Sequence, residues 1–281
     1  IQRIGNGPDE YIQATDFTID AENRQIILLC DIPNCLMYFD IDGKFLKRER
    51  KENYDSYVSA AHNALFFSSF LIHDKYYLNI RNGNKHTEFL PIEKYILNKD
   101  FYSPHPNIIR SSSVYFFKVY DNTIYKIESD GVTPQYKIDF GPKSVDKSFI
   151  EKNDMEKIIM TSIENNWICR INDFRECGNF ITFGLWPFTS IVIYDKQKKT
   201  STLFSKFYDP EIGLYLSDLI GYDGDGCDMI FIMNPALFKN NVLNIKNMEV
   251  AVKNETYLKY KKVAENLAEI DNPILMVYSM K

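Results

Sequence analysis

Residues 38–44, with the sequence YFDIDGK, carry the pattern that decides the fold: an apolar strand that runs into an Asp-Gly turn. This pattern is the strongest short-range signal of a β-hairpin. It returns at residues 125–131 as YKIESDG, more weakly at 78–84 as LNIRNGN, and without the glycine at 191–196 as IVIYDK. The three turn glycines, Gly43, Gly83 and Gly131, lie 40 and then 48 residues apart. Short strands that repeat at this spacing predict a β-propeller.

Turn signals divide the chain into complete and partial blades of four strands. Complete blades are expected at about residues 13–50, 55–91, 106–140 and 166–207. A fifth, irregular unit has expected strands at 215–221 and 228–233, a helical insert at about 235–270, and a final strand at 274–281 that should pair beside 228–233. The helix prediction rests on apolar residues that recur at helical spacing up to Pro273.

The two ends of the chain leave the number of blades open. Residues 1–5 resemble the last strand of a preceding blade. We therefore expect one all-β domain over residues 1–281, with six blades when complete and the first blade largely missing. The alternative is a five-bladed ring in which residues 1–5 complete the last blade, because a blade shared between the termini removes exposed sheet edges.

Composition narrows the class of protein. The 281 residues carry a net charge of -5 and are 15% aromatic, which fits pleated, half-buried surfaces. A general nucleic-acid binder would be basic, so no nucleic-acid partner is expected. No apolar run reaches the ~20 residues of a transmembrane helix. A chain that begins with Ile1 suggests processing, so any signal peptide would already be gone.

The sequence contains no recognisable catalytic motif. The four histidines, at positions 62, 73, 86 and 105, show no metal-binding spacing. The sequence holds no G-x-S-x-G nucleophile elbow and no glycine-rich phosphate loop. We therefore expect a non-catalytic binding module without a cofactor. The alternative is a carbohydrate- or ester-active enzyme with its site on the propeller face, which would need a pair of carboxylates at a defined separation.

Two short segments have both a binding and a structural interpretation. Asp223, Asp225 and Asp228, in the segment DGDGCD, form the best candidate for a metal site, but Asp and Gly also suit a tight turn. The segment Gly5 to Pro8 could form an anion-binding nest, or a blade connection that needs positive φ at glycine. We expect the structural interpretation in both cases.

Two aromatic loops give the expected ligand site. Residues 91–106 and 185–188 carry the densest aromatic side chains outside the strands, and long loops on rigid scaffolds commonly bind ligands. The ligand would be a glycan or a protein. The expected contacts are Tyr102, His105, Arg110, Trp186 and Phe188. The alternative is that these rings pack between blades.

The five cysteines, at positions 30, 35, 169, 177 and 227, are an odd number, and none shares a C-x-x-C motif. One interpretation makes all five small buried thiols. The other bridges Cys30 and Cys35, because a hairpin brings facing residues within reach of a disulfide.

Three segments resemble a large family of six-bladed propellers from Gram-negative gut anaerobes. Residues 4–11, IGNGPDEY, resemble its G-x-GPGEY element, 38–45 resemble its Y-D-x-x-GKF strand, and 271–281 resemble its closing DNPVL-x-x-Y-x-x-K segment. Asp9 stands where the family often has glycine, and the fourth repeat is weak. The family is related in shape to NHL and TolB-like propellers.

That resemblance implies where the protein works. It implies export to the periplasm or the outer-membrane surface, in many members as a lipoprotein, so that a lipid anchor would sit on a segment preceding residue 1. It also implies a monomer that binds an unidentified glycan or protein.

Overall fold

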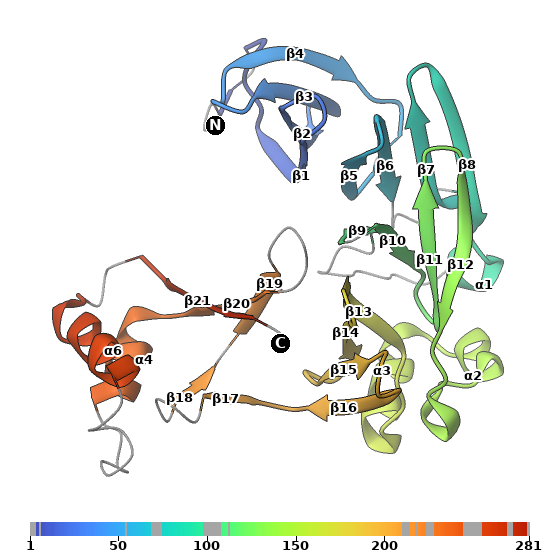
Figure 1. The fold of residues 1–281 in the computed structure, drawn as a ribbon. Coiled ribbons are helices and arrows are strands. Elements are labelled where there is room, and N and C mark those ends of the chain that lie inside the picture. Colours follow the sequence, from blue (N-terminus) through green and yellow to red (C-terminus); the bar gives the residue numbers. More distant parts are fainter. Residues whose placement is uncertain are drawn as a thin grey trace. The chain divides into compact units, whose positions relative to one another are not determined.

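A computed structural model describes residues 4–5, 7–53, 55–68, 75–97, 108–111, 113–209, 214–216, 218–222, 228–243, 255–268 and 272–279. The fold is all-β, and its four-stranded sheets are antiparallel meanders whose strands follow chain order (Figure 1). The chain divides into two compact units: Ile1–Phe174 with Gly184–Phe188, and Arg175–Phe183 with Thr189–Lys281.

The first sheet contains the hairpin that opened the sequence analysis. Its strands are β1 (Gln13–Asp20), β2 (Gln25–Ile32), β3 (Cys35–Asp40) and β4 (Phe45–Arg50). The Asp40 carboxylate accepts the N–H groups of Asp42 and Lys44, and Gly43 has a φ of 84°. Positive φ is the reason that this turn favours glycine. The central strands β2 and β3 are mostly buried, whereas β1 and β4 are largely exposed or half-buried.

The second and third sheets repeat this plan. The second contains β5 (Tyr57–Ala61), β6 (Ala64–Ser68), β7 (Tyr76–Asn82) and β8 (Lys85–Pro91). The third contains β9 (Ile108–Arg110), β10 (Val114–Phe117), β11 (Thr123–Glu128) and β12 (Gly131–Lys137). The predicted hairpin turns lie between β7 and β8 and between β11 and β12, so the repeat found in the sequence is a repeat of sheets.

First strands of successive sheets lie side by side, β1 against β5 and β5 against β9. Side chains of β1 and of the turn after it accept backbone N–H groups of β5 and its turn. The bonds run from Val58 to Asp16 at 2.8 Å, from Ala60 to Thr18 at 3.1 Å, and from His62 and Asn63 to Glu22 at 2.9 and 2.6 Å. We call this row the β1–β5 seam. Meandering sheets joined through their first strands are the blades of a β-propeller.

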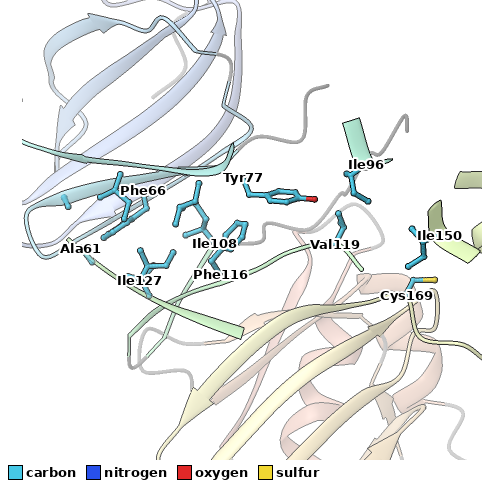
Figure 2. Close-up of a cluster of buried hydrophobic side chains, with 14 of the residues drawn as sticks. Ala61, Phe66, Tyr77, Ile96, Ile108, Phe116, Val119, Ile127, Ile150 and Cys169 are labelled. Atoms are coloured by element: carbon cyan, nitrogen blue, oxygen red, sulfur yellow. The ribbon is translucent and has the colours of Figure 1, made fainter. Parts of the chain in front are cut away.

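Apolar side chains fill the space between the sheets of the first unit. One cluster joins sheets one and two, where Leu29 and Leu36 contact the group around Phe67. The largest cluster extends from Ala61 and Phe66 past Tyr77 to Ile150 and Cys169 (Figure 2). Because each cluster draws on more than one sheet, the blades are joined by burial as well as by hydrogen bonds.

Short helices, absent from the sequence prediction, follow the second and third sheets. They are α1 (Lys94–Leu97), the 3-10 helix η1 (Gly141–Lys143), α2 (Lys147–Lys152) and α3 (Met155–Asn165). Asp146 caps α2, and Asp154 caps α3 by accepting the Lys157 N–H at 2.8 Å. These are ordinary N-caps, and α3 buries Ile158 in the large cluster.

The fourth sheet contains β13 (Arg170–Cys177), β14 (Phe180–Trp186), β15 (Ile191–Asp195) and β16 (Thr200–Phe204). Downstream lie β17 (Phe207–Asp209), β18 (Leu214–Leu216), β19 (Asp218–Tyr222), β20 (Asp228–Met233), α4 (Pro235–Leu243), α6 (Glu255–Asn266) and β21 (Ile274–Ser279). The single strand predicted over 215–221 is therefore wrong, because β18 and β19 pair in different sheets.

The predicted pairing of the last strand is confirmed. β21 pairs antiparallel with β20, from Ile274 opposite Met233 to Ser279 opposite Asp228. The helices α4 and α6, which lie against each other (Figure 1), stand between β20 and β21 in the chain. Their buried residues Phe238 and Ala264 share one core cluster with Met276 of β21.

The glycines of the N-terminal motif act differently from the prediction. Neither Gly5 nor Gly7 has a positive φ. Instead the Glu10 carboxylate folds over both: it accepts the Gly7 N–H at 2.7 Å, and a Cβ at Gly5 would lie 2.2 Å from its Oε2. Arg48 of β4 donates to the carbonyls of Gly7 and Glu10. The motif needs glycine for close approach.

The cysteines divide into two groups. Cys30, Cys35 and Cys169 are buried and free, as the first interpretation expected, and the predicted disulfide between Cys30 and Cys35, which face each other across the hairpin, is not formed. Burial raises the pKa of the Cys30 thiol to about 12, and the neighbouring Cys35 adds to the shift. Cys177 is disulfide-bonded, so the expectation of five free thiols is wrong. Cys227 lies outside the described residues.

Candidate functional site

The predicted aromatic ligand face is only partly within the described structure. Tyr102 and His105 lie outside the described residues. Trp186 is half-buried and packs against the large core cluster, and the Arg170 guanidinium lies 5.2 Å from the centre of its ring. Phe188 is half-buried. The contacts of Trp186 serve packing, and a recognition face built from these loops stays a prediction.

Arg110 ends β9 and holds neighbouring blades. Its Nη1 donates to the Ala60 carbonyl at 3.0 Å and to the Ile19 carbonyl at 3.3 Å. The guanidinium thus bridges the first strands of the first and second sheets.

The predicted metal site falls largely on Asp223 and Asp225, which lie outside the described residues. Asp228 begins β20 and pairs with Ser279. Within the described ranges, no three His, Cys, Asp or Glu side chains gather closely enough to hold a metal ion.

A polar cleft between the first and second sheets is the candidate site that the described residues offer. It consists of two pockets of about 600 and 620 Å³, which share Glu49, Arg81 and His86. The first, the Lys51 pocket, continues between the loop after β4 and strands β7 and β8. The second, the Asn23 pocket, continues toward the turns after β1, β5 and β7. We call the two together the interblade cleft.

Four side chains, Tyr38, Lys47, Glu49 and Arg81, form a hydrogen-bonded network in the cleft, and two of them, Glu49 and Arg81, line both pockets. Glu49 of β4 accepts the Tyr38 hydroxyl at 2.9 Å, the Lys47 ammonium at 2.6 Å and, as an ion pair at 3.0 Å, Arg81 of β7. Arg81 also donates to the Tyr38 hydroxyl. Lys47 lies 4.3 Å from the centre of the Tyr38 ring. Charge-assisted bonds of this kind hold side chains in fixed positions before any ligand arrives.

This network favours the ionised form of the Glu49 carboxyl and the neutral form of the Tyr38 hydroxyl. Burial alone would raise the pKa of Glu49, but hydrogen bonds from Lys47 and Tyr38 and the charge of Arg81 outweigh it and lower that pKa. Burial raises the pKa of Tyr38 far above its ordinary value. Neither group is therefore tuned to exchange protons near neutral pH, as a general acid or base would be. The arrangement suits binding.

A buried ion pair belongs to the lining of the Lys51 pocket. Lys51 Nζ lies 3.1 Å from Asp55 Oδ2, and their side chains are 7% and 5% exposed. Burial raises the pKa of Asp55, against the charge of Lys51 and a hydrogen bond from Asn79. Asn34 holds the loop by donating to the carbonyls of Lys51 and Asn53. The pair is thus fixed from both sheets.

Sequence reasoning missed the cleft, because its residues are far apart in the chain. Tyr38 and Arg81 are 43 positions apart and meet only when two sheets face each other. One local signal existed: Lys47 and Glu49 alternate on β4, which places both on one face of the strand. The sequence thus predicts that this face of the strand is polar, but it does not predict that the face lies opposite Arg81.

Comparison with known proteins places the chain among domains without an assigned function. A family described as "Domain of unknown function (DUF4934)" matches residues 1–279. No curated protein matches. Among solved structures, one from Bacteroides fragilis NCTC 9343, described as a "putative exported protein", has a TM-score of 0.74 at 18% identity, covering 99% of this chain and 80% of that one. At this identity the likeness concerns the fold.

Two more distant solved structures are similar over part of their length. Virginiamycin B lyase from Staphylococcus aureus has a TM-score of 0.45 at 16% identity, covering 81% of this chain and 64% of that one. The β-propeller domain of Cps50 (Swd1) from Myceliophteria thermophila has a TM-score of 0.44 at 10% identity, covering 83% and 66%. Among the described helices of this chain, none has the length and apolar character to cross a bilayer.

Proposed function

Because this chain belongs to the DUF4934 family of domains of unknown function, we propose its role from the site: a non-catalytic module that binds a glycan in the interblade cleft. The observation that supports this role is the composition of the cleft wall. Amide, carboxylate and guanidinium side chains line the cleft, and Asn23, Asn63, Asn79 and Asn84 are among them. Each amide side chain offers both donors and an acceptor, which is what a ligand rich in hydroxyl groups requires.

The preorganised hydrogen-bonded network supports glycan binding for an energetic reason. A flexible polar ligand loses much of its binding free energy when protein side chains must first be ordered. In the cleft, Glu49 and Arg81 are already held by each other and by Tyr38. A protein ligand is the competing partner, and the experiment below distinguishes the two.

The finer assignments made from the sequence belong to the same proposal. We propose export to the periplasm or the outer-membrane surface, a lipid anchor, a monomer and a six-bladed propeller of NHL or TolB-like type formed by one domain. The description of the Bacteroides fragilis relative supports export. Fractionation of the source cells with an antibody against the protein tests it, and recovery with the cytoplasm would contradict it.

The function is tested on an array of neutral and charged oligosaccharides. We expect the protein to retain neutral glycans and the double variant His86→Ala/Glu88→Ala to lose about tenfold or more in affinity, because both side chains line the cleft. The matched control is Lys85→Ala, which lies on the other face of the same strand. Glycan binding that the cleft variant leaves unchanged, or no binding to any oligosaccharide on the array, would overturn the proposal.

A further inference from the structure

The interblade cleft follows two outer strands lengthwise. Along β4 its lining passes from Lys47 in the Asn23 pocket, through the shared Glu49, to Lys51 in the Lys51 pocket. Along β8 it passes in the same way from the shared His86 to Glu88 in the Lys51 pocket. These positions are two residues apart, as expected for side chains on one face of a strand. The cleft is therefore a groove parallel to both strands, with one pocket beyond the other.

Exposed side chains line both ends of this groove. The turns after β1, β5 and β7 lie at the end where β4 and β8 begin, and there Asn23, Asn63 and Asn84 are exposed. The loop after β4 lies at the opposite end, and there Glu52 and Asn53 are exposed. A groove lined by exposed residues at both ends accepts a chain that continues beyond it in both directions.

The groove is longer than one sugar ring. From Lys47 to Lys51 the strand advances about 13 Å, at a rise of about 3.3 Å per residue. The two pockets, of about 600 and 620 Å³, each have the volume of a site that encloses a whole small ligand, which is about 300–1,000 Å³. One ring therefore contacts one pocket only, whereas several linked rings laid along the strands reach both.

The junction of the two pockets is accessible to a ligand. Glu49 and Arg81 line both pockets and form an ion pair between the sheets at 3.0 Å, and their side chains are 33% and 20% exposed. His86 is opposite Arg81 in the register of β7 and β8 and is exposed. The Arg81 guanidinium also has more N–H donors than its contacts with Glu49 and Tyr38 use. A polar ligand that crosses the junction therefore finds hydrogen-bonding groups there.

Resting on the proposed function, we infer that the ligand is an internal stretch of a polysaccharide chain, which lies along β4 and β8, occupies both pockets and crosses over the Glu49–Arg81 ion pair. The competing arrangement is two separate sites, with the ion pair as the wall between them. The two arrangements differ in stoichiometry, because a spanning chain binds once per protein and separate sites bind two chains.

Calorimetry with a length series on the unaltered protein tests the inference. The probes are cello-, xylo-, manno- and malto-oligosaccharides, from the disaccharide to the hexasaccharide. We expect at least one series to gain about tenfold or more in affinity over this range, with one chain per protein, because added rings form further hydrogen bonds. No gain with length, or two chains per protein, would overturn this inference and leave the proposed function standing. Absence of binding to every probe would overturn both.

A polymer distinguishes an internal stretch from a chain end. The soluble polysaccharide with the backbone of the best series is fractionated by length and mixed with an excess of protein. Analytical ultracentrifugation then measures how many protein molecules each chain carries. This number should rise in proportion to chain length. A number that is the same for short and long chains would overturn the inference, because it would show that chain ends are bound.

Single substitutions at the two ends of the groove test whether one chain contacts both. Asn84 lines only the Asn23 pocket and Glu88 only the Lys51 pocket, and both are exposed. Asn84→Ala and Glu88→Ala should each weaken the hexasaccharide by about threefold to tenfold, and the double variant by the product of the two factors. The matched control is Asn82→Ala, because exposed Asn82 lies on the other face of β7 from Arg81. Variants that remove one bound chain each and leave the affinity of the other unchanged would show two separate sites.

Discussion

At the residue scale, burial and hydrogen bonding have opposite effects on the pKa of Asp16. Burial raises the pKa of its carboxyl to about 6, although the N–H groups of Val58 and Phe17 oppose the shift. The folded protein therefore holds this proton more tightly than the unfolded chain, whose aspartate pKa lies near 4. The contribution of Asp16 to stability is most favourable below about pH 4 and falls as the pH rises through about 6.

We predict that Asp16→Asn raises stability at neutral pH. The asparagine oxygen still accepts the Val58 N–H, and no charge is left buried. The gain in the free energy of unfolding should be about 1–2 kcal/mol at pH 7 and near zero at pH 4. Denaturant melts at several pH values measure it. Thr18→Val is the control, since it removes the neighbouring seam acceptor without a titratable group. A pH-independent difference for Asp16→Asn would contradict the assignment.

Gly5 and Glu10 should depend on each other. Gly5→Ala forces the Glu10 carboxylate away from its position 2.2 Å from the new Cβ and so breaks its bond to the Gly7 N–H. We expect a loss of about 1 kcal/mol in stability. The same change made in a Glu10→Ala background should cost much less. A double-mutant cycle measures this coupling, and equal costs in both backgrounds would show that the carboxylate is not the reason for glycine.

At the scale of elements, local chemistry predicted strands and turns well. The Asp42-Gly43 turn forms as expected, because its requirements for positive φ and side-chain acceptance lie within a few residues. The helices α2 and α3 were missed although Asp146 and Asp154 are N-caps. The buried positions are few, since α3 buries only Ile158 and Ser162, and so short a helical pattern does not stand out among strands.

The candidate site escaped prediction for a different reason. Tyr38, Glu49 and Arg81 lie on three strands of two sheets, and only the facing of those sheets joins them. Aromatic loop composition pointed instead to Trp186, whose ring packs against the core. Composition can identify a ring, but whether that ring contacts a ligand or a core depends on its neighbours in space.

Removal of β21 should weaken the sheet that it closes. Deleting residues 273–281 exposes the edge of β20, takes Met276 out of its core cluster and removes the Tyr278 bond to Asp209 at 2.9 Å. We expect the thermal midpoint to fall by about 5–15 °C. Calorimetry measures it, with a deletion of residues 280–281 as the control. An unchanged midpoint in the longer deletion would show that this pairing contributes little.

At the scale of the whole molecule, the buried thiols report how the first unit opens. Cys30 and Cys35 lie in the first sheet, and Cys169 belongs to the large cluster next to the third. Since the seam and the clusters join these sheets, we predict that all three thiols react with iodoacetamide over the same range of denaturant. Peptide mapping by mass spectrometry follows each one, and Cys177 should react only after reduction. Labelling of Cys169 well before Cys30 would show that the sheets open separately.

The β1–β5 seam has a consequence for how tolerant the protein is to change. Side chains act on one side of it, at Asp16, Thr18 and Glu22, but only main-chain amides act on the other. The two sides therefore differ in what they require: the side chains that accept must keep an acceptor in place, whereas the main-chain amides that donate can belong to any residue except proline that suits the local backbone and packing. In a saturation mutagenesis screen for folding, exposed His62, whose φ of 52° suits Asn and Gly, should accept these two replacements, which Glu22 should reject. The sequence of the second sheet can therefore change along this edge while its hydrogen bonds to the first sheet are kept.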